Sequence, residues 1–117
     1  MTILMVRMKL LTLDPYFVDV LMPDLAGHER SPAAFLVYLY LWRHQMASRV
    51  GSVQASYTNI ALATGLSRIT AQRATALLIR RKLISARRKH RTSVPHYTVD
   101  RPWIGRLQRA TPQRVFG

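Results

Sequence analysis

The chain has 117 residues, of which 49% are hydrophobic, and this suffices for one compact domain with an ordinary core. Its 18 Lys and Arg side chains outnumber five Asp and Glu, and the net charge of +13 favours a polyanionic partner over a small neutral substrate. The lack of cysteine excludes disulfides, thiolate metal sites and cysteine nucleophiles. The longest apolar run, residues 33–42, is too short to cross a membrane, so we expect a cytoplasmic, nucleoid-associated protein without a membrane partner.

The basic residues are concentrated in the later part of the chain. Fifteen of them are arginines, which can bind phosphate and guanine through two parallel hydrogen bonds. Four of the acids precede Arg30, whereas residues 31–117 carry 15 basic groups and one acid, Asp100, a net charge of +14. We therefore expect the partner-facing surface beyond Arg30. Solubility, non-specific association and a ribosomal environment are the alternative reasons for such a surplus.

Residues 1–30 are predicted to be an N-terminal extension that packs on the core or on a dimer partner. Residues 1–13 are compatible with an extra strand or helix, a dimerisation arm or a frayed end, and they lack the cleavage site of a signal peptide. Asp14-Pro15 is a start signal for a helix or turn, and the apolar residues up to Pro23 suit a short strand or a short helix. Residues 24–30, which are polar and contain Gly27, are predicted to be a loop.

A long helix is predicted to begin at Ser31 and Pro32 and to run to about Val50. Serine is a preferred N-cap, and proline is favoured at the first helical position. Because its apolar residues surround the helix, we expect it to lie centrally in the core, with a dimer contact as the alternative. Residues 51–55 have room for a very short strand.

Residues 56–84 are predicted to be two helices joined by a tight turn. Ser56 and Ser67 are suited to cap the helices, and Gly65 can adopt the left-handed conformation that ends the first one. Small alanines would let the two axes approach each other closely. One face of the second helix is apolar, through Ile69 or Thr70 and then Ala71, Ala74, Leu77, Leu78 and Leu83, and the opposite face carries Arg68, Gln72, Arg73, Arg80 and Arg81.

This stretch resembles the helix-turn-helix of winged-helix transcription regulators. The resemblance spans roughly residues 31–99 and rests on Ile60-Ala61, Gly65-Leu66-Ser67, Ala71, Ala74, Leu78 and Leu83-Ile84. Two positions depart from the pattern: Ala71 stands where a β-branched residue is more common, and Lys82 stands where a glycine often ends the helix. The resemblance implies a mainly α fold with a small β-hairpin (α+β), a winged helix-turn-helix domain at residues 31–99.

After Leu83 the pattern changes to the alternation of a β-hairpin, with a basic tip at residues 87–91 and a returning run at His96–Val99. The resemblance identifies this hairpin, residues 84–99, as the wing. Because Pro95 has no N–H, the returning strand is expected to pair only on its outer part or to lie at a sheet edge. Residues 100–117 are predicted to be a basic, partly disordered tail in which Trp103 and Ile104 can dock on the core.

The predicted partner is double-stranded DNA. In this motif the N-terminal half of the second helix enters the major groove, where Arg reads guanine and Gln reads adenine, while wing arginines meet the backbone or a narrow minor groove. Arg80 and Arg81 lie nearer the other end of the helix and are expected to be solvated or to favour the helix dipole. The predicted DNA-binding residues are Thr58, Ser67, Arg68, Thr70, Gln72, Arg73, Arg88, Lys89 and Arg91.

No catalytic pattern is apparent in the sequence. The five acids are scattered, no Gly-rich phosphate loop occurs, and the four histidines, His28, His44, His90 and His96, lack metal-ligand spacing. We therefore predict a non-enzymatic, sequence-specific DNA-binding protein, a transcription regulator and homodimer, with no metal, cofactor or small-molecule ligand. The alternatives are a plasmid or phage replication or partition factor, and a winged-helix module that binds RNA or protein.

Overall fold

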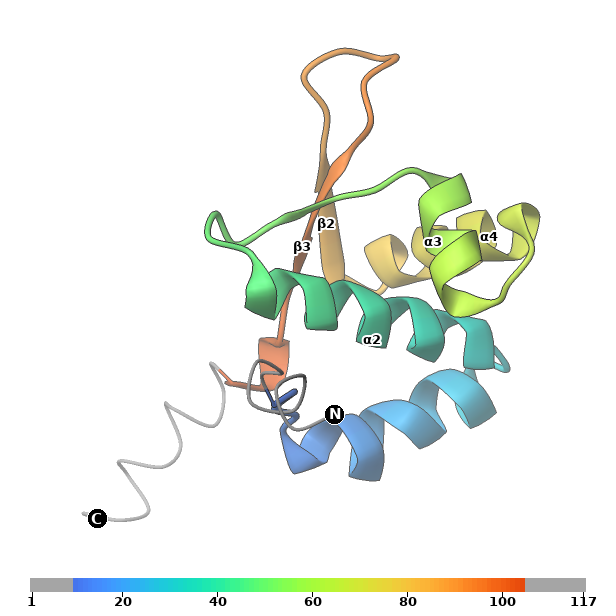
Figure 1. The fold of residues 1–117 in the computed structure, drawn as a ribbon. Helices are drawn as coiled ribbons and strands as arrows, with labels where there is room; N and C mark the ends of the chain where they lie inside the picture. Colours follow the sequence, from blue (N-terminus) through green and yellow to red (C-terminus); the bar gives the residue numbers. More distant parts are fainter. Residues whose placement is uncertain (1–9, 105–117) are drawn as a thin grey trace, which may run out of the picture.

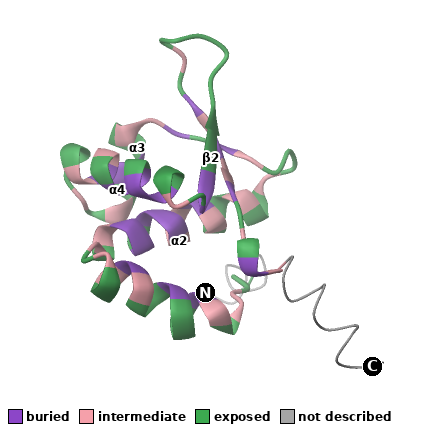
Figure 2. Cartoon of the chain, turned by 180° about the vertical axis from the view of Figure 1, so that it is seen from behind, coloured by how far each residue is buried: buried purple, intermediate pink, exposed green. Residues whose placement is uncertain are grey.

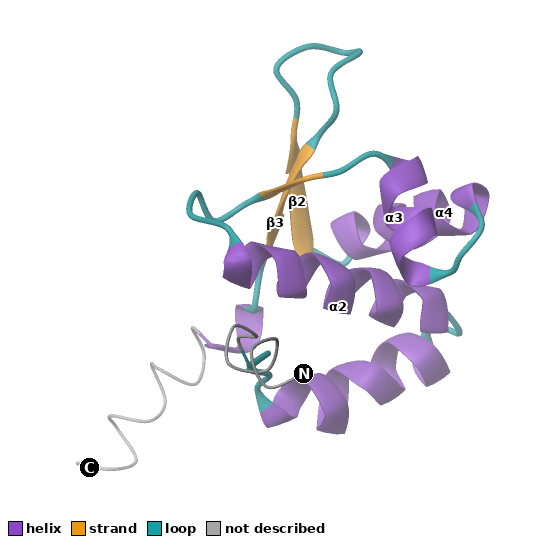
Figure 3. Ribbon diagram, in the orientation of Figure 1, coloured by secondary structure: helices purple, strands orange, loops and turns teal. Residues whose placement is uncertain are grey.

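A computed structural model of the chain describes residues 10–104 (Figure 1). The structure is mostly helical with one small antiparallel sheet, which confirms the predicted α+β class and is consistent with a winged helix. Figure 3 shows the loop between β2 and β3 extending well away from the helices. In chain order the elements are η1 (Phe17–Leu21), η2 (Pro23–His28), α2 (Pro32–Ala47), β1 (Val53–Gln54), α3 (Tyr57–Thr64), α4 (Arg68–Arg80), β2 (Ile84–Arg87) and β3 (His96–Val99).

Helix α2 lies at the centre of the fold, as predicted. It begins where Ser31 Oγ accepts the N–H of Ala34 at 3.1 Å, and Pro32 occupies its first turn. One side of α2 packs on η2, and the other packs on α3, α4 and β3 (Figure 1). Burial on both sides explains why its apolar residues surround the helix. Figure 2 shows much of α2 coloured as buried, and its buried residues are Ala34, Phe35, Val37, Tyr38 and Leu41.

The expectation of a loop at residues 24–30 is wrong, because the N-terminal helix continues through Pro23 to His28. Its turns are widened into π-type turns, in which the N–H of Met22 bonds to Phe17 and that of Glu29 bonds to Asp24. A proline inside an ordinary α-helix removes a hydrogen bond and clashes with the preceding turn, and a π-bulge leaves room for its ring. Phe17, Leu21 and Leu25 are the buried residues of this helix.

The sheet has the strand order β1-β3-β2, so the strand that returns from the hairpin is the central one. The expectation that Pro95 would restrict this strand to an edge is therefore wrong. Pro95 lies one residue before β3, which leaves the N–H groups of the strand free to pair, and its carbonyl accepts the N–H of Ala55 at 3.3 Å. The Gln45 side chain, from α2, both accepts from Val99 N at 2.6 Å and donates to Val99 O at 3.2 Å. These two bonds fix the sheet to the central helix.

Residues 100–104 return to the start of the N-terminal helix, and the predicted docking of Trp103 is confirmed. Its ring is buried, stacks on Tyr16 at 4.4 Å between ring centroids and meets Phe17 edge-on at 5.6 Å. The Asp14 carboxylate accepts hydrogen bonds from Trp103 Nε1 at 3.2 Å and from Arg101. The predictions for residues 1–9 and for the tail beyond residue 104 lie outside the described residues. The division of the chain at residues 30 and 99 stays a prediction.

Candidate nucleic-acid interface

Side chains and one glycine set the ends of both helices of the helix-turn-helix. Ser56 and Asn59 form a reciprocal capping box at the start of α3, each accepting the other's backbone N–H at 3.0 Å. Gly65 ends α3 with a φ of 78°, a conformation that costs a residue with a Cβ more than it costs glycine. Ser67 then caps α4 by accepting the N–H of Thr70 at 3.1 Å. The two predicted helices and the predicted turn are confirmed.

The buried side of α4 consists of Ala71, Ala74, Thr75, Leu77 and Leu78, and it packs on α2 and α3. Arg68, Ile69 and Arg73 lie exposed on the other side, whereas Thr70 and Gln72 are half-buried between the two. Of the two alternatives for the first inward position, Thr70 therefore suits the structure better than Ile69. The N-terminal half of α4 presents a basic surface on a well-packed helix.

Helix α4 ends without a glycine. Lys82 itself takes the left-handed conformation with a φ of 60°, which a lysine adopts only at a cost in free energy. The N–H of Leu83 bonds back to the carbonyl of Leu78 at 2.9 Å, as in a glycine-terminated helix. The chain is thereby turned inward at Leu83 and passes directly into β2. The departure of Lys82 from the family pattern leaves the shape of the helix end unchanged.

The sequence predicts that Arg81 is a solvated residue of the helix face. In the structure it is instead held by two carboxylates. Its guanidinium donates to Asp24 Oδ2 at 2.5 Å and to Glu29 Oε2 at 2.6 Å, with 32% of its side chain exposed. The hydrogen bond to Asp24, reinforced by that to Glu29, raises the pKa of Arg81. The acidic N-terminal helix thus holds the C-terminal end of α4 in place through Arg81.

We expect the substitution Arg81→Met to lower the free energy of unfolding by roughly 2 kcal/mol, because it leaves two half-buried carboxylates close together without a cation. Urea denaturation followed by circular dichroism measures the loss. The matched control is Arg80→Met, one residue earlier, whose exposed side chain makes no ion pair among residues 10–104 and whose loss should change stability by less than about 0.5 kcal/mol. Equal effects of the two substitutions would contradict the assigned role of Arg81.

A hollow of about 230 Å³ lies between the starts of α3 and α4 and the wing. Arg68 lies over the Tyr57 ring, 5.9 Å from its centroid, and Arg88 Nη1 donates to the Ser93 carbonyl at 3.0 Å. Burial, with smaller contributions from Tyr57, raises the pKa of Tyr97 to about 12, so its phenol is neutral at physiological pH. We call this site the inner hollow, and its lining residues are Ser56, Tyr57, Arg68, Arg88, Thr92, Ser93, Val94, Pro95 and Tyr97.

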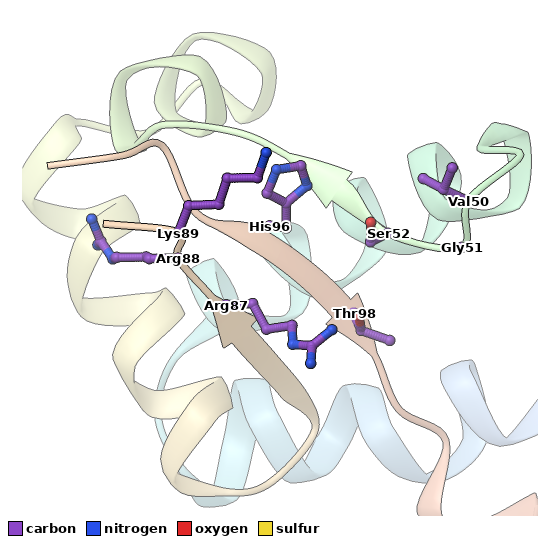
Figure 4. A pocket seen from close by; sticks show the side chains of 8 residues that line it. All are labelled: Val50, Gly51, Ser52, Arg87, Arg88, Lys89, His96 and Thr98. Carbon is purple, nitrogen blue, oxygen red and sulfur yellow. The ribbon is translucent and has the colours of Figure 1, made fainter. Parts of the chain in front are cut away.

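The predicted DNA-binding residues do not all gather at one place. Thr58, in the first turn of α3, and Arg73, on α4, are exposed, and Lys89 and Arg91 are exposed on the wing. Figure 4 shows Arg88 pointing toward the side of α4, while Lys89 lies on the other side of the sheet near His96. The structure thus joins Arg68 and Arg88 in the inner hollow, which Lys89 does not line.

Tyr57 is a candidate site residue that sequence reasoning missed. Its ring packs under Arg68, and it lines the inner hollow together with Arg88. A tyrosine can both stack with a guanidinium and donate a hydrogen bond to a phosphate. An aromatic residue directly after the capping Ser56 was the available signal, but without a fold nothing indicated that the wing would lie opposite it.

Other kinds of site find little support in the part of the chain that the structure describes. Residues 10–104 contain no group of three or more His, Asp or Glu arranged to hold a metal ion. Across the same residues, the helices are too short or too polar to cross a bilayer.

A comparison with known protein families matches residues 31–84 to a helix-turn-helix domain. Searches of curated proteins and of solved structures found no match to this chain. The matched segment begins at the cap of α2 and ends at the first residue of β2, so it contains the central helix and both helices of the motif. Residues 31–84 thus match a helix-turn-helix domain in sequence and hold the two helices and the turn of that motif.

Proposed function

We propose that this protein binds double-stranded DNA in a sequence-specific manner and regulates transcription. The observation that carries the proposal is the distribution of charge around the helix-turn-helix. Among residues 10–104, three acids are engaged in ion pairs, Asp24 and Glu29 with Arg81 and Asp14 with Arg101. Arg68, Arg73, Arg88, Lys89 and Arg91 have no carboxylate partner within the same residues. Cations left unpaired on the helix-turn-helix and the wing favour a polyanion.

In the proposed complex the N-terminal half of α4 enters the major groove. Arg68 and Arg73 reach guanine edges from its exposed face, and the half-buried Gln72 reaches adenine from the margin. Ser67 Oγ already caps α4 and donates to Thr70 Oγ1 at 2.8 Å, which leaves the Thr70 hydroxyl to donate to a phosphate. Thr58 meets a second phosphate, and the inner hollow accommodates the backbone that runs between α4 and the wing.

The wing contributes Arg88 and Arg91, which contact the backbone or a narrow minor groove. Lys89 lies on the other side of the sheet, so in the proposed complex it does not contact this duplex. One helix-turn-helix reads only a few base pairs, so we propose that the protein acts as a homodimer on a two-part site. Binding rather than catalysis is the proposed activity, and neither a cofactor nor a small-molecule ligand enters it.

Selection of bound fragments from genomic DNA, followed by titration of the best duplex at several salt concentrations, tests the proposal. If about six phosphates are contacted, the logarithm of the affinity should fall with the logarithm of salt concentration with a slope of roughly −5. Fragments upstream of genes would support transcription regulation, whereas repeated sites at a replication origin would favour the replication factor. A nearly flat salt response, or displacement of the duplex by an equal concentration of hairpin RNA, would contradict duplex-specific binding.

A further inference from the structure

A second hollow, of about 490 Å³, lies on the outer face of the sheet. Residues of the α2–β1 loop border it on one side, and the strands of the wing form its floor (Figure 4). Arg88 lies at the margin that it shares with the inner hollow. We call this site the outer hollow, and its lining residues are Val50, Gly51, Ser52, Arg87, Arg88, Lys89, His96 and Thr98.

The alternation of the strands explains why these side chains face outward. Tyr97 and Val99 are buried against the core. Because side chains alternate along a strand, His96 and Thr98 point to the other face. Arg87 pairs directly with His96 across the strands, a register that brings their Cβ atoms to within about 5 Å. Lys89 extends over the same face and ends beside the imidazole of His96 (Figure 4).

The outer hollow gathers hydrogen-bond donors without a compensating acid. Arg87, Lys89 and His96 can donate from one side, and the hydroxyls of Ser52 and Thr98 from another. No Asp or Glu lines it, and no ion pair engages Arg87 or Lys89 within the described residues. Arg87 and Lys89 line the same hollow, so their charges repel each other unless an anion neutralises them, and a phosphate accepts bonds from several such donors at once.

We propose that the outer hollow binds phosphate groups separately from the duplex that lies on α4. The separation follows from the pleat, because Arg87 and Lys89 lie on the opposite side of the sheet from the inner hollow (Figure 4). One source of such phosphates is the backbone of a second DNA duplex, in which case one chain holds two duplexes. A free polyphosphate has the same chemistry. The two-duplex form of the proposal rests on the proposed function of α4.

The test variant is the double substitution Arg87→Gln with His96→Gln. Both side chains lie on the outer face, and neither has been placed in contact with the first duplex. The matched control is Arg43→Gln with His44→Gln, an exposed Arg–His pair on α2 that lines neither hollow. The control removes the same charge and the same type of ring.

Two measurements on the full chain separate the sources of phosphate. In the first, an immobilised duplex loaded with protein captures a second, labelled duplex. In the second, inorganic triphosphate is titrated into each protein and its binding is followed by isothermal titration calorimetry. We expect the test variant to lose at least about tenfold in capture, in triphosphate affinity, or in both, while the control changes neither. If a homodimer joined two duplexes only through its two α4 helices, the test variant would still capture the second duplex.

Three results would overturn the proposal: capture and triphosphate binding that are both independent of Arg87 and His96, an equal loss in the control, or an equal loss of affinity for the first duplex. The last result would show that the outer hollow belongs to the same duplex as α4. Failure of the proposed function is distinguishable, because the triphosphate measurement does not require α4 to bind DNA. A protein that binds triphosphate at His96 but no duplex would refute the reading of DNA by α4 and leave the phosphate site standing.

Discussion

The double substitution Arg68→Ala with Arg73→Ala should lower the affinity for the selected duplex by about a thousandfold. Each arginine that makes two bonds to a guanine contributes about 1–3 kcal/mol, and two of them together give roughly 4 kcal/mol. Both side chains are exposed on the N-terminal half of α4, so their loss should leave the fold intact. Fluorescence anisotropy at one fixed salt concentration measures the affinity, and thermal unfolding verifies the fold.

The control for charge alone is Arg43→Ala with Arg80→Ala. It also removes two exposed arginines, but from α2 and from the C-terminal end of α4. Because only non-specific attraction is lost, the affinity should fall far less and the preference for the selected sequence should remain. If the Arg68/Arg73 variant kept its sequence preference while Arg88→Ala abolished it, the wing rather than α4 would be the reading element.

The substitution Trp103→Ala should lower the free energy of unfolding by about 3–5 kcal/mol, the usual loss for a large aromatic side chain removed from a core. Trp103 is 3% exposed and closes an aromatic cluster with Tyr16 and Phe17. Its indole N–H also donates to Asp14. Urea denaturation of the full chain measures the loss, which corresponds to more than 10 °C in melting temperature for a domain of this size.

Trp103→Phe is the graded control for this prediction. Phenylalanine keeps most of the ring contacts but cannot donate to Asp14, so a loss of about 1–2 kcal/mol is expected. An alanine variant as stable as the natural protein would mean that residues 100–104 do not contribute to the folded core. That outcome would support the predicted boundary at residue 99.

Local signals explain why much of the fold could be predicted. A capping serine precedes each of the helices α2, α3 and α4, and a glycine in the left-handed conformation ends α3. The switch from helical spacing to alternation after Leu83 correctly indicated the β2–β3 hairpin. Each of these features depends on the hydrogen bonds of a few neighbouring residues, so a stretch of sequence is enough to recognise it.

The errors arose where a distant segment decides the outcome. Pro23 looked like the end of a helix, but packing of Phe17, Leu21 and Leu25 on α2 keeps the chain helical through widened turns. Pro95 looked like the mark of an edge strand, but β1 pairs with β3 from the residue after it. In both cases tertiary contacts outweighed the local preference of proline.

For the candidate site, the sequence by itself determined which residue types are present and on which elements they lie: the arginines of α4, the basic wing and the scarcity of acids beyond Arg30. Only the tertiary structure decided their partners. It places Arg81 between Asp24 and Glu29 and brings Tyr57 beneath Arg68. It also places Arg87 and Lys89 in the outer hollow and not in the inner one. The physical reason is that helix caps and strand alternation are local, whereas ion pairs and hollows join residues that are distant along the chain.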